Sequence, residues 1–236
     1  MSTLRLHQHL RLNAVAVLMP ALAACGGGSA GTASAAANCL ADAADAPCQL
    51  LDEATLRAAL SGLPDTVNQE QATLGRQLEC RYSWSGGRQQ SIQIGAMSME
   101  VDAEDQVTLS NIRPLEADDP VQSFRFSHRT PDAEQQARMN AMARERADEE
   151  LKDKQLSEGA AEAVRSAAGS MASKIQWESI EGLGDAAAWG GLGRFKLLEV
   201  LVGNTTFSID AQVANAESDR RDAAVAVARA IVARCD

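Results

Sequence analysis

Five cysteines limit what this 236-residue chain can fold into more than any other feature. They are Cys25, Cys39, Cys48, Cys80 and Cys235. Cys25 has its own explanation, given below, so four remain, and an even number in an exported chain indicates two disulfides. Three pairings are possible. We favour Cys48–Cys80 together with Cys39–Cys235.

The favoured pairing has structural consequences. Cys48–Cys80 would tie the first predicted helix to the first predicted strand, and Cys39–Cys235 would join the two ends of the domain. In the chain-entropy model a bridge across so long a loop contributes about 4–5 kcal/mol. Metal binding is the competing interpretation, but the chain has no C-x-x-C pair. For a reactive thiol, no neighbouring residue indicates thiolate activation.

The start of the chain has the features of a bacterial lipoprotein precursor. Arg5 and Arg11 precede an apolar run, Leu12–Ala24, which is too short to span a bilayer as a helix. The run ends in Leu22-Ala23-Ala24-Cys25, which matches a lipobox. We expect residues 1–24 to be a signal peptide and Cys25 to carry acyl chains such as palmitate. The alternative is an ordinary signal peptide cleaved after Ala24.

A flexible tether is predicted next, over residues 25–38. This segment is rich in Gly, Ser and Ala and has no large apolar side chain to bury. Residues 39–236 are long enough for one domain with a sizeable core. We therefore expect a lipid-anchored protein of the cell envelope. Because Gly26 rather than Asp follows the lipobox cysteine, the outer membrane, on its periplasmic side, is the expected location in a cell with two membranes.

The charge of the chain excludes one class of partner. The formal net charge is −10 at pH 7, and loss of Arg5 and Arg11 with the signal peptide makes it −10 − 2 = −12. Nucleic-acid binding requires clustered Lys and Arg, so no nucleic-acid partner is expected. Anionic lipid would also repel such a chain, so the acyl chains must hold it on the membrane. The acidity reflects either plain solubility or a basic protein partner.

Apolar periodicity predicts an α+β domain. Helices are expected at 53–61, with Asp52 as N-cap, at 131–173 and at 219–234. Strands are expected at 78–84, 91–96, 121–128, 174–180, 186–189, 194–202 and 205–213, with a turn at 85–87 and a loop at 65–77. Short connections between neighbouring strands predict an antiparallel β-sheet flanked by helices. The 131–173 segment would be a helical insertion.

Two stretches carry a family likeness. The first is Pro47–Asp52 (PCQLLD), followed by Cys80–Trp84 (CRYSW). The second is Glu181–Trp189 (EGLGDAAAW), followed by a hairpin and an Ala-rich last helix. The chain resembles small bacterial lipoproteins of unknown function that share a PsbP-like α/β/α sandwich. The resemblance implies this fold over roughly 47–235 and a cell-envelope setting. It implies no reaction, and the better known relatives act as accessory or binding subunits.

The sequence offers no catalytic constellation. His7 and His9 belong to the predicted signal peptide, so His128 would be the single histidine of the mature chain. The sequence shows no Ser-His-Asp or Cys-His arrangement around it, and we expect a structural role for His128. The segment 182–185 (GLGD) lacks the third glycine and the lysine of a phosphate loop. It is expected to be a turn between strands, in which Asp185 accepts hydrogen bonds from backbone amides.

Acidic and aromatic residues also predict no metal or cofactor site. Two acidic clusters are expected on loops: Asp102, Glu104 and Asp105, and Glu116, Asp118 and Asp119. Neither cluster has the spacing of a calcium loop, so solvated charge is the preferred interpretation. The three tryptophans, Trp84, Trp177 and Trp189, either pack in the core, which we favour, or line a ligand pocket.

The sequence therefore predicts a non-enzymatic binding or interaction module, with the 131–173 insertion as the expected partner surface. The partner itself is not indicated. One alternative is a carrier of a small molecule or lipid, with a cleft between sheet and helix. Another is an immunity-type inhibitor of a basic toxin or hydrolase, which the acidic charge would favour.

Overall fold

The computed structural model describes residues 35–75, 77–94, 97–152, 154, 157–172, 175–193 and 195–235. The predicted signal peptide (1–24), the lipidation site Cys25 and residues 25–34 of the predicted tether lie outside these ranges. No helix among the described residues is long and apolar enough to cross a membrane.

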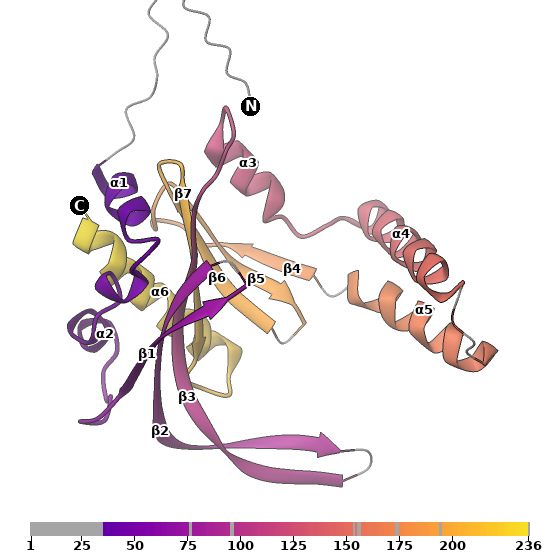
Figure 1. Ribbon diagram of the computed structural model, residues 1–236, viewed down its shortest axis with the longest axis horizontal. Coiled ribbons are helices and arrows are strands. Elements are labelled where there is room, and N and C mark those ends of the chain that lie inside the picture. Colours follow the sequence, from indigo (N-terminus) through magenta and orange to yellow (C-terminus); the bar gives the residue numbers. More distant parts are fainter. Residues whose placement is uncertain are drawn as a thin grey trace, which may run out of the picture. The chain divides into compact units, whose positions relative to one another are not determined.

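Helices and strands alternate in blocks along the chain (Figure 1). The helices are α1 (Ala35–Asp42), the 3-10 turn η1 (Pro47–Gln49), α2 (Glu53–Ala59), α3 (Pro120–Ser127), α4 (Ala133–Leu151), α5 (Glu158–Ala172) and α6 (Glu217–Cys235). The strands are β1 (Asn68–Leu74), β2 (Gln77–Ile94), β3 (Met97–Pro114), β4 (Ile175–Ser179), β5 (Ala186–Leu192), β6 (Phe195–Val202) and β7 (Thr205–Gln212).

One seven-stranded sheet organises the domain, in the order β1-β2-β3-β7-β6-β5-β4. Every neighbouring pair is antiparallel, which confirms the predicted α+β class with an antiparallel sheet and flanking helices. The chain leaves the sheet after β3, forms α3, α4 and α5, and returns as the edge strand β4. The predicted helical segment 131–173 is thus a helical hairpin between two strands.

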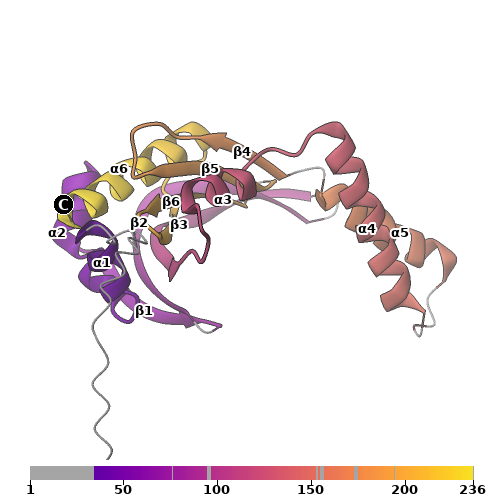
Figure 2. The ribbon, with the colours of Figure 1, turned by 90° about the horizontal axis from the view of Figure 1, so that it is seen from above.

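The main core lies between the sheet and α6, with α1 and α2 beside it (Figure 2). Strand residues alternate between the two faces of the sheet, and on β7 Phe207, Ile209 and Ala211 point to this core. From α6, Val227 and Ile231 meet them with no exposed surface. Fully burying such a side chain contributes about 1.5–3 kcal/mol.

Both favoured cysteine pairs lie at bonding distance. The Sγ atoms of Cys39 and Cys235 are 1.99 Å apart, which joins α1 to the last residue of α6. Those of Cys48 and Cys80 are 2.08 Å apart, which joins η1 to β2. Both bridges border the main core. The first structural element starts earlier than expected, because residues 35–38, assigned to the tether by sequence, belong to α1, where Ala36 and Ala37 are buried.

The strand predicted at 121–128 is wrong, because these residues form α3. Asp119 caps the helix by accepting a hydrogen bond from the Gln122 N–H, at 2.9 Å, and Pro120 occupies its first turn. The alternation of Phe124 and Phe126 suggested a strand. In the helix the two rings diverge, since Phe124 is 2% exposed and Phe126 is 64% exposed.

The turn predicted at 85–87 is also wrong. β2 runs through it and pairs with β3 from Cys80 to Ile94, with a bulge between Ser85 and Arg88. Gly86 is required there because a Cβ would clash with the Asp105 carboxylate, which accepts a hydrogen bond from Arg88 at 2.7 Å. The acidic cluster Asp102, Glu104 and Asp105 therefore lies on β3 and not on a loop.

The predicted loop at 65–77 contains β1. Its side chains are polar because β1 is an edge strand with little apolar surface to cover, so it lacks the alternation that marks a half-buried strand.

Candidate functional site

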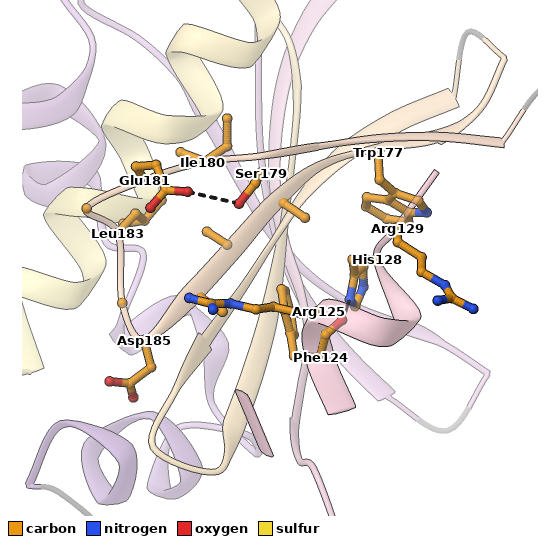
Figure 3. A pocket seen from close by; sticks show the side chains of 15 residues that line it. Phe124, Arg125, His128, Arg129, Trp177, Ser179, Ile180, Glu181, Leu183 and Asp185 are labelled. Atoms are coloured by element: carbon orange, nitrogen blue, oxygen red, sulfur yellow. Dashed lines mark hydrogen bonds between the residues drawn. The ribbon is translucent and has the colours of Figure 1, made fainter. Parts of the chain in front are cut away.

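The second face of the sheet is covered by α3 and contains a pocket of about 360 Å³ (Figure 3). On one side the pocket is lined by four residues of α3 and the segment after it: Phe124, Arg125, His128 and Arg129. Opposite lie Trp177 of β4 and residues 179–188, which include the loop between β4 and β5.

Small residues on the sheet allow α3 to approach closely. Phe124 is buried against Ala186, Ala188 and Leu201 in a second, smaller apolar cluster. Because alanines occupy β5 beneath it, the phenyl ring sits near the backbone of the sheet. A larger residue at either alanine would clash with Phe124 unless α3 moved away from the sheet.

His128 fastens the end of α3 to the sheet. Its ring stacks on Phe124, with centroids 4.1 Å apart, and meets the edge of Trp177 at 4.6 Å. Its Nδ1 lies 2.8 Å from the Phe124 carbonyl oxygen, and its Nε2 lies 3.0 Å from Glu199 Oε2. His128 thus contacts both Phe124 and Trp177 and has a partner at each ring nitrogen, and its structural role stays a prediction.

The loop at 180–185 is held in one conformation from both ends. The Ile180 N–H donates to the Ala187 carbonyl and the Asp185 N–H to the Leu201 carbonyl, each at 2.8 Å. The Asp185 carboxylate accepts from the Gly203 N–H at 2.6 Å. The loop is the predicted turn between strands, and Asp185 does bind a backbone amide, although that amide belongs to the β6–β7 turn.

Two arginines border the pocket from the α3 side. Figure 3 shows Arg125 extending toward the loop that carries Leu183 and Asp185. Within the part of the chain that the structure describes, no side-chain partner of Arg125 is found. The Arg129 guanidinium lies over the Phe126 ring, 4.1 Å from its centroid. Arg125 is therefore available to a ligand.

A larger cavity of about 1030 Å³ lies next to the pocket, between α4 and the β4–β5 edge of the sheet. We call it the apolar groove. Its lining consists of Phe126, Ser127, Arg129, Pro131, Gln135, Arg138, Met139, Ala141, Met142, Ile175, Trp177, Gly191 and Leu192. No carboxylate is present in this lining.

Helical and strand periodicity produce the two walls of the groove. On α4, Gln135, Met139 and Met142 recur at helical spacing and so share one face. On β4, Ile175 and Trp177 are two residues apart and point the same way. The Trp177 backbone is fixed at the edge, because the Thr130 hydroxyl accepts from its N–H and donates to its carbonyl, both at 2.9 Å.

The pocket and the apolar groove lie side by side and share two lining side chains. Trp177 and Arg129 line both cavities. The pocket contributes hydrogen-bonding groups, among them the Ser179 hydroxyl and the Arg125 guanidinium, and the groove contributes almost only carbon and sulfur. The combined site therefore has a polar end and an apolar end.

Comparisons with protein-family models, with curated proteins and with solved structures found no match. Among the described residues, no group of three or more His, Cys, Asp or Glu side chains is arranged to hold a metal ion.

The sequence located the parts of this site unevenly. Trp84 and Trp189 lie in the main core, as favoured, whereas Trp177 lines the pocket and the apolar groove. Of the 131–173 segment, Pro131 and α4 border the groove, and α5 packs on α4. Phe126 was not predicted to line a site, because its segment was assigned to a strand. The helical spacing of Met139 and Met142, four and seven residues after Gln135, was the available sign of an apolar face on α4.

Proposed function

We propose that this protein is a non-enzymatic binding module of the bacterial cell envelope, held on the membrane by a lipidated Cys25. Its PsbP-like sandwich would present the apolar groove to a small hydrophobic ligand. The observation that carries the proposal is the groove itself. Its volume of about 1030 Å³ lies just above the range of about 300–1,000 Å³ typical of ligand sites.

Exposed apolar side chains support a binding role for the groove. Phe126 is 64% exposed and Met142 is 54% exposed, and Leu192 lies on the opposite wall. Neighbouring exposed apolar residues of this kind mark interaction sites. Methionines favour binding of varied shapes because their side chains are unbranched and polarizable.

A neutral fluorescent probe tests this function. N-phenyl-1-naphthylamine should bind with saturable fluorescence enhancement, and Met142→Glu should weaken its binding about tenfold, since a charge would then line the groove. Met99→Glu is the matched control, because Met99 is 47% exposed on β3, away from the groove. Absence of saturable binding, or equal weakening in both variants, would refute the proposal.

The proposed anchor has a separate test. Cells expressing the full chain should incorporate labelled palmitate into the protein, and Cys25→Ala should abolish the label. Persistence of the label in the variant would contradict lipidation at Cys25.

A protein partner is the second candidate occupant of this side of the domain. Val164 on α5 is 43% exposed, and Met142 on α4 also presents apolar surface. Under this alternative the α4–α5 hairpin would be the contact surface. Loss of partner binding with Val164→Glu, but normal probe binding, would favour it over the small-ligand function.

A further inference from the structure

We propose that the ligand is a free fatty acid, with its acyl chain in the apolar groove and its carboxylate bound by Arg125 and Arg129. The inference rests on the proposed function and adds the chemical class of the ligand and its orientation.

The distribution of polar groups sets the orientation. The groove is bordered by apolar side chains over the stretch of α4 from Gln135 to Met142, which is about 10 Å of helix. That length suits an acyl chain of medium length. At the end nearest the pocket, Arg129 lines both cavities and Arg125 extends across the pocket. A chain lying in the groove would therefore present its head to Arg129, and the exposed Arg125 side chain, which extends away from Arg129 in Figure 3, would turn back across the pocket to share the carboxylate.

Charge complementarity indicates an anionic head. The chain as a whole carries 32 acidic and 22 basic residues, yet the groove lining includes Arg129 and Arg138 and no carboxylate. Arg138 is engaged by Glu134 at 3.2 Å. Arg125 has no such partner among the described residues, so a ligand carboxylate would supply the missing acceptors. Guanidinium groups bind carboxylates with two parallel hydrogen bonds, which fixes the head.

The opposite rim of the pocket favours a head with a single negative charge. Glu181 and Asp185 line that rim. The Glu181 carboxylate accepts a hydrogen bond from the Ser179 hydroxyl at 3.3 Å, and the Asp185 carboxylate is bound to Gly203 N–H. Both donors are neutral, so the two carboxylates keep their negative charge. They would therefore repel a doubly charged phosphate more than a singly charged carboxylate.

Displacement of N-phenyl-1-naphthylamine from the full-length domain tests the inference with three twelve-carbon amphiphiles below their micelle concentrations. Laurate should displace the probe at a concentration at least tenfold lower than dodecyltrimethylammonium, which has the opposite charge. Dodecyl phosphate, whose head is doubly charged at pH 8, should also be weaker than laurate at that pH. Shortening the acid should weaken displacement about threefold to fourfold for each methylene removed.

Variants then locate the head. Arg125→Gln should weaken laurate binding about fivefold, and the double variant Arg125→Gln with Arg129→Gln should weaken it about tenfold or more. The dissociation constant of the neutral probe should change less than twofold in Arg125→Gln. Arg144→Gln is the matched control, since Arg144 is exposed on α4 but does not line the groove. It should leave laurate binding unchanged.

The outcomes separate the two levels of the account. Saturable probe binding with equal displacement by laurate and the cation would overturn the fatty-acid inference and leave the binding function standing. Stronger displacement by dodecyl phosphate would also overturn the free acid, in favour of a phosphate head. Failure of the probe to bind the parent protein would overturn the proposed function itself.

Discussion

The two faces of the sheet differ in how they are closed. On the α6 face, two disulfides border a core in which Tyr82, Leu198 and Ile231 have essentially no exposed surface. On the α3 face, the described residues include no disulfide, and the buried cluster is limited to a few residues around Phe124. Beyond that cluster the apolar side chains of the groove are exposed or half-buried.

This difference separates the stabilising part of the molecule from the part proposed to bind. The same strands serve both, because alternate residues point to opposite faces. Binding segments are commonly less stable than the scaffold that holds them. We therefore expect substitutions on the α6 face to change stability without changing binding, and substitutions on the α3 side to do the reverse unless they reach Phe124.

The largest effect is expected from the bridge between the ends of the domain. Cys39 and Cys235 are 196 positions apart. Their joint replacement by Ser should lower the free energy of unfolding by about 5 kcal/mol in the chain-entropy model. Urea unfolding followed by circular dichroism measures this. A loss below about 1 kcal/mol would show that the α6 face does not depend on its bridge.

Truncation of one core residue on each face sharpens the comparison. Ile231→Ala and Phe124→Ala should each cost about 3–4 kcal/mol, because both side chains are buried and leave a cavity. Only Phe124→Ala should also weaken probe binding, since Phe124 supports α3 and lines the pocket. Equal binding by the two folded variants would remove the functional distinction between the faces.

A capping residue of the α6 side gives an intermediate effect with a defined pH dependence. The Thr55 N–H, and next the Arg234 guanidinium, hold the pKa of Asp52 at about 2. Asp52 caps α2 and reaches α6 through Arg234, so Asp52→Ala should cost about 1 kcal/mol at pH 7. Because the folded pKa is lowered from 3.8, this contribution is present above pH 4 and is lost as the pH falls toward 2.

Acid titration of both proteins checks that prediction. The difference in unfolding free energy between parent and Asp52→Ala should shrink from pH 4 downward and largely vanish at pH 2. A difference that stays constant across this range would assign the effect of the substitution to something other than the carboxylate charge.

The smallest effect on stability is expected from the helical hairpin. α4 buries only Ala147 among its residues. Replacing residues 132–173 by a Gly/Ser linker should therefore lower the unfolding free energy by about 1 kcal/mol or less. Probe binding should be lost, because one wall of the groove is removed. Loss of cooperative melting would show instead that the hairpin belongs to the folding unit.

The sequence predicted the α6 side much better than the α3 side, for a local reason. Strands β6 and β7 alternate clearly, Gly203 and Asn204 mark their turn, and α6 begins at Glu217, two residues before the predicted start of the helix. Such signals lie within a few residues of the structure that they specify. The cysteine pairs could also be narrowed from the sequence, because four cysteines in an exported chain allow only three pairings.

The candidate site could not be read in this way. Phe126 and Phe124 alternate as in a strand, and only the Asp119–Pro120 cap reveals a helix. The groove joins Met142 to Trp177, residues whose proximity depends on how α4 returns to the sheet edge. The bulge in β2 was hidden likewise, because Gly86 serves a contact with Asp105 on another strand.

Hydrogen exchange, with and without laurate, tests the central claim most directly. Without ligand, amides in β6, β7 and α6 should exchange only through global unfolding, while those of α4 exchange much faster. Laurate should slow exchange in α3, α4, β4 and the 180–185 loop and leave α6 unchanged. Protection of α4 equal to that of α6 before ligand is added, or ligand protection confined to β2 and β3, would contradict the division between a closed face and a binding face.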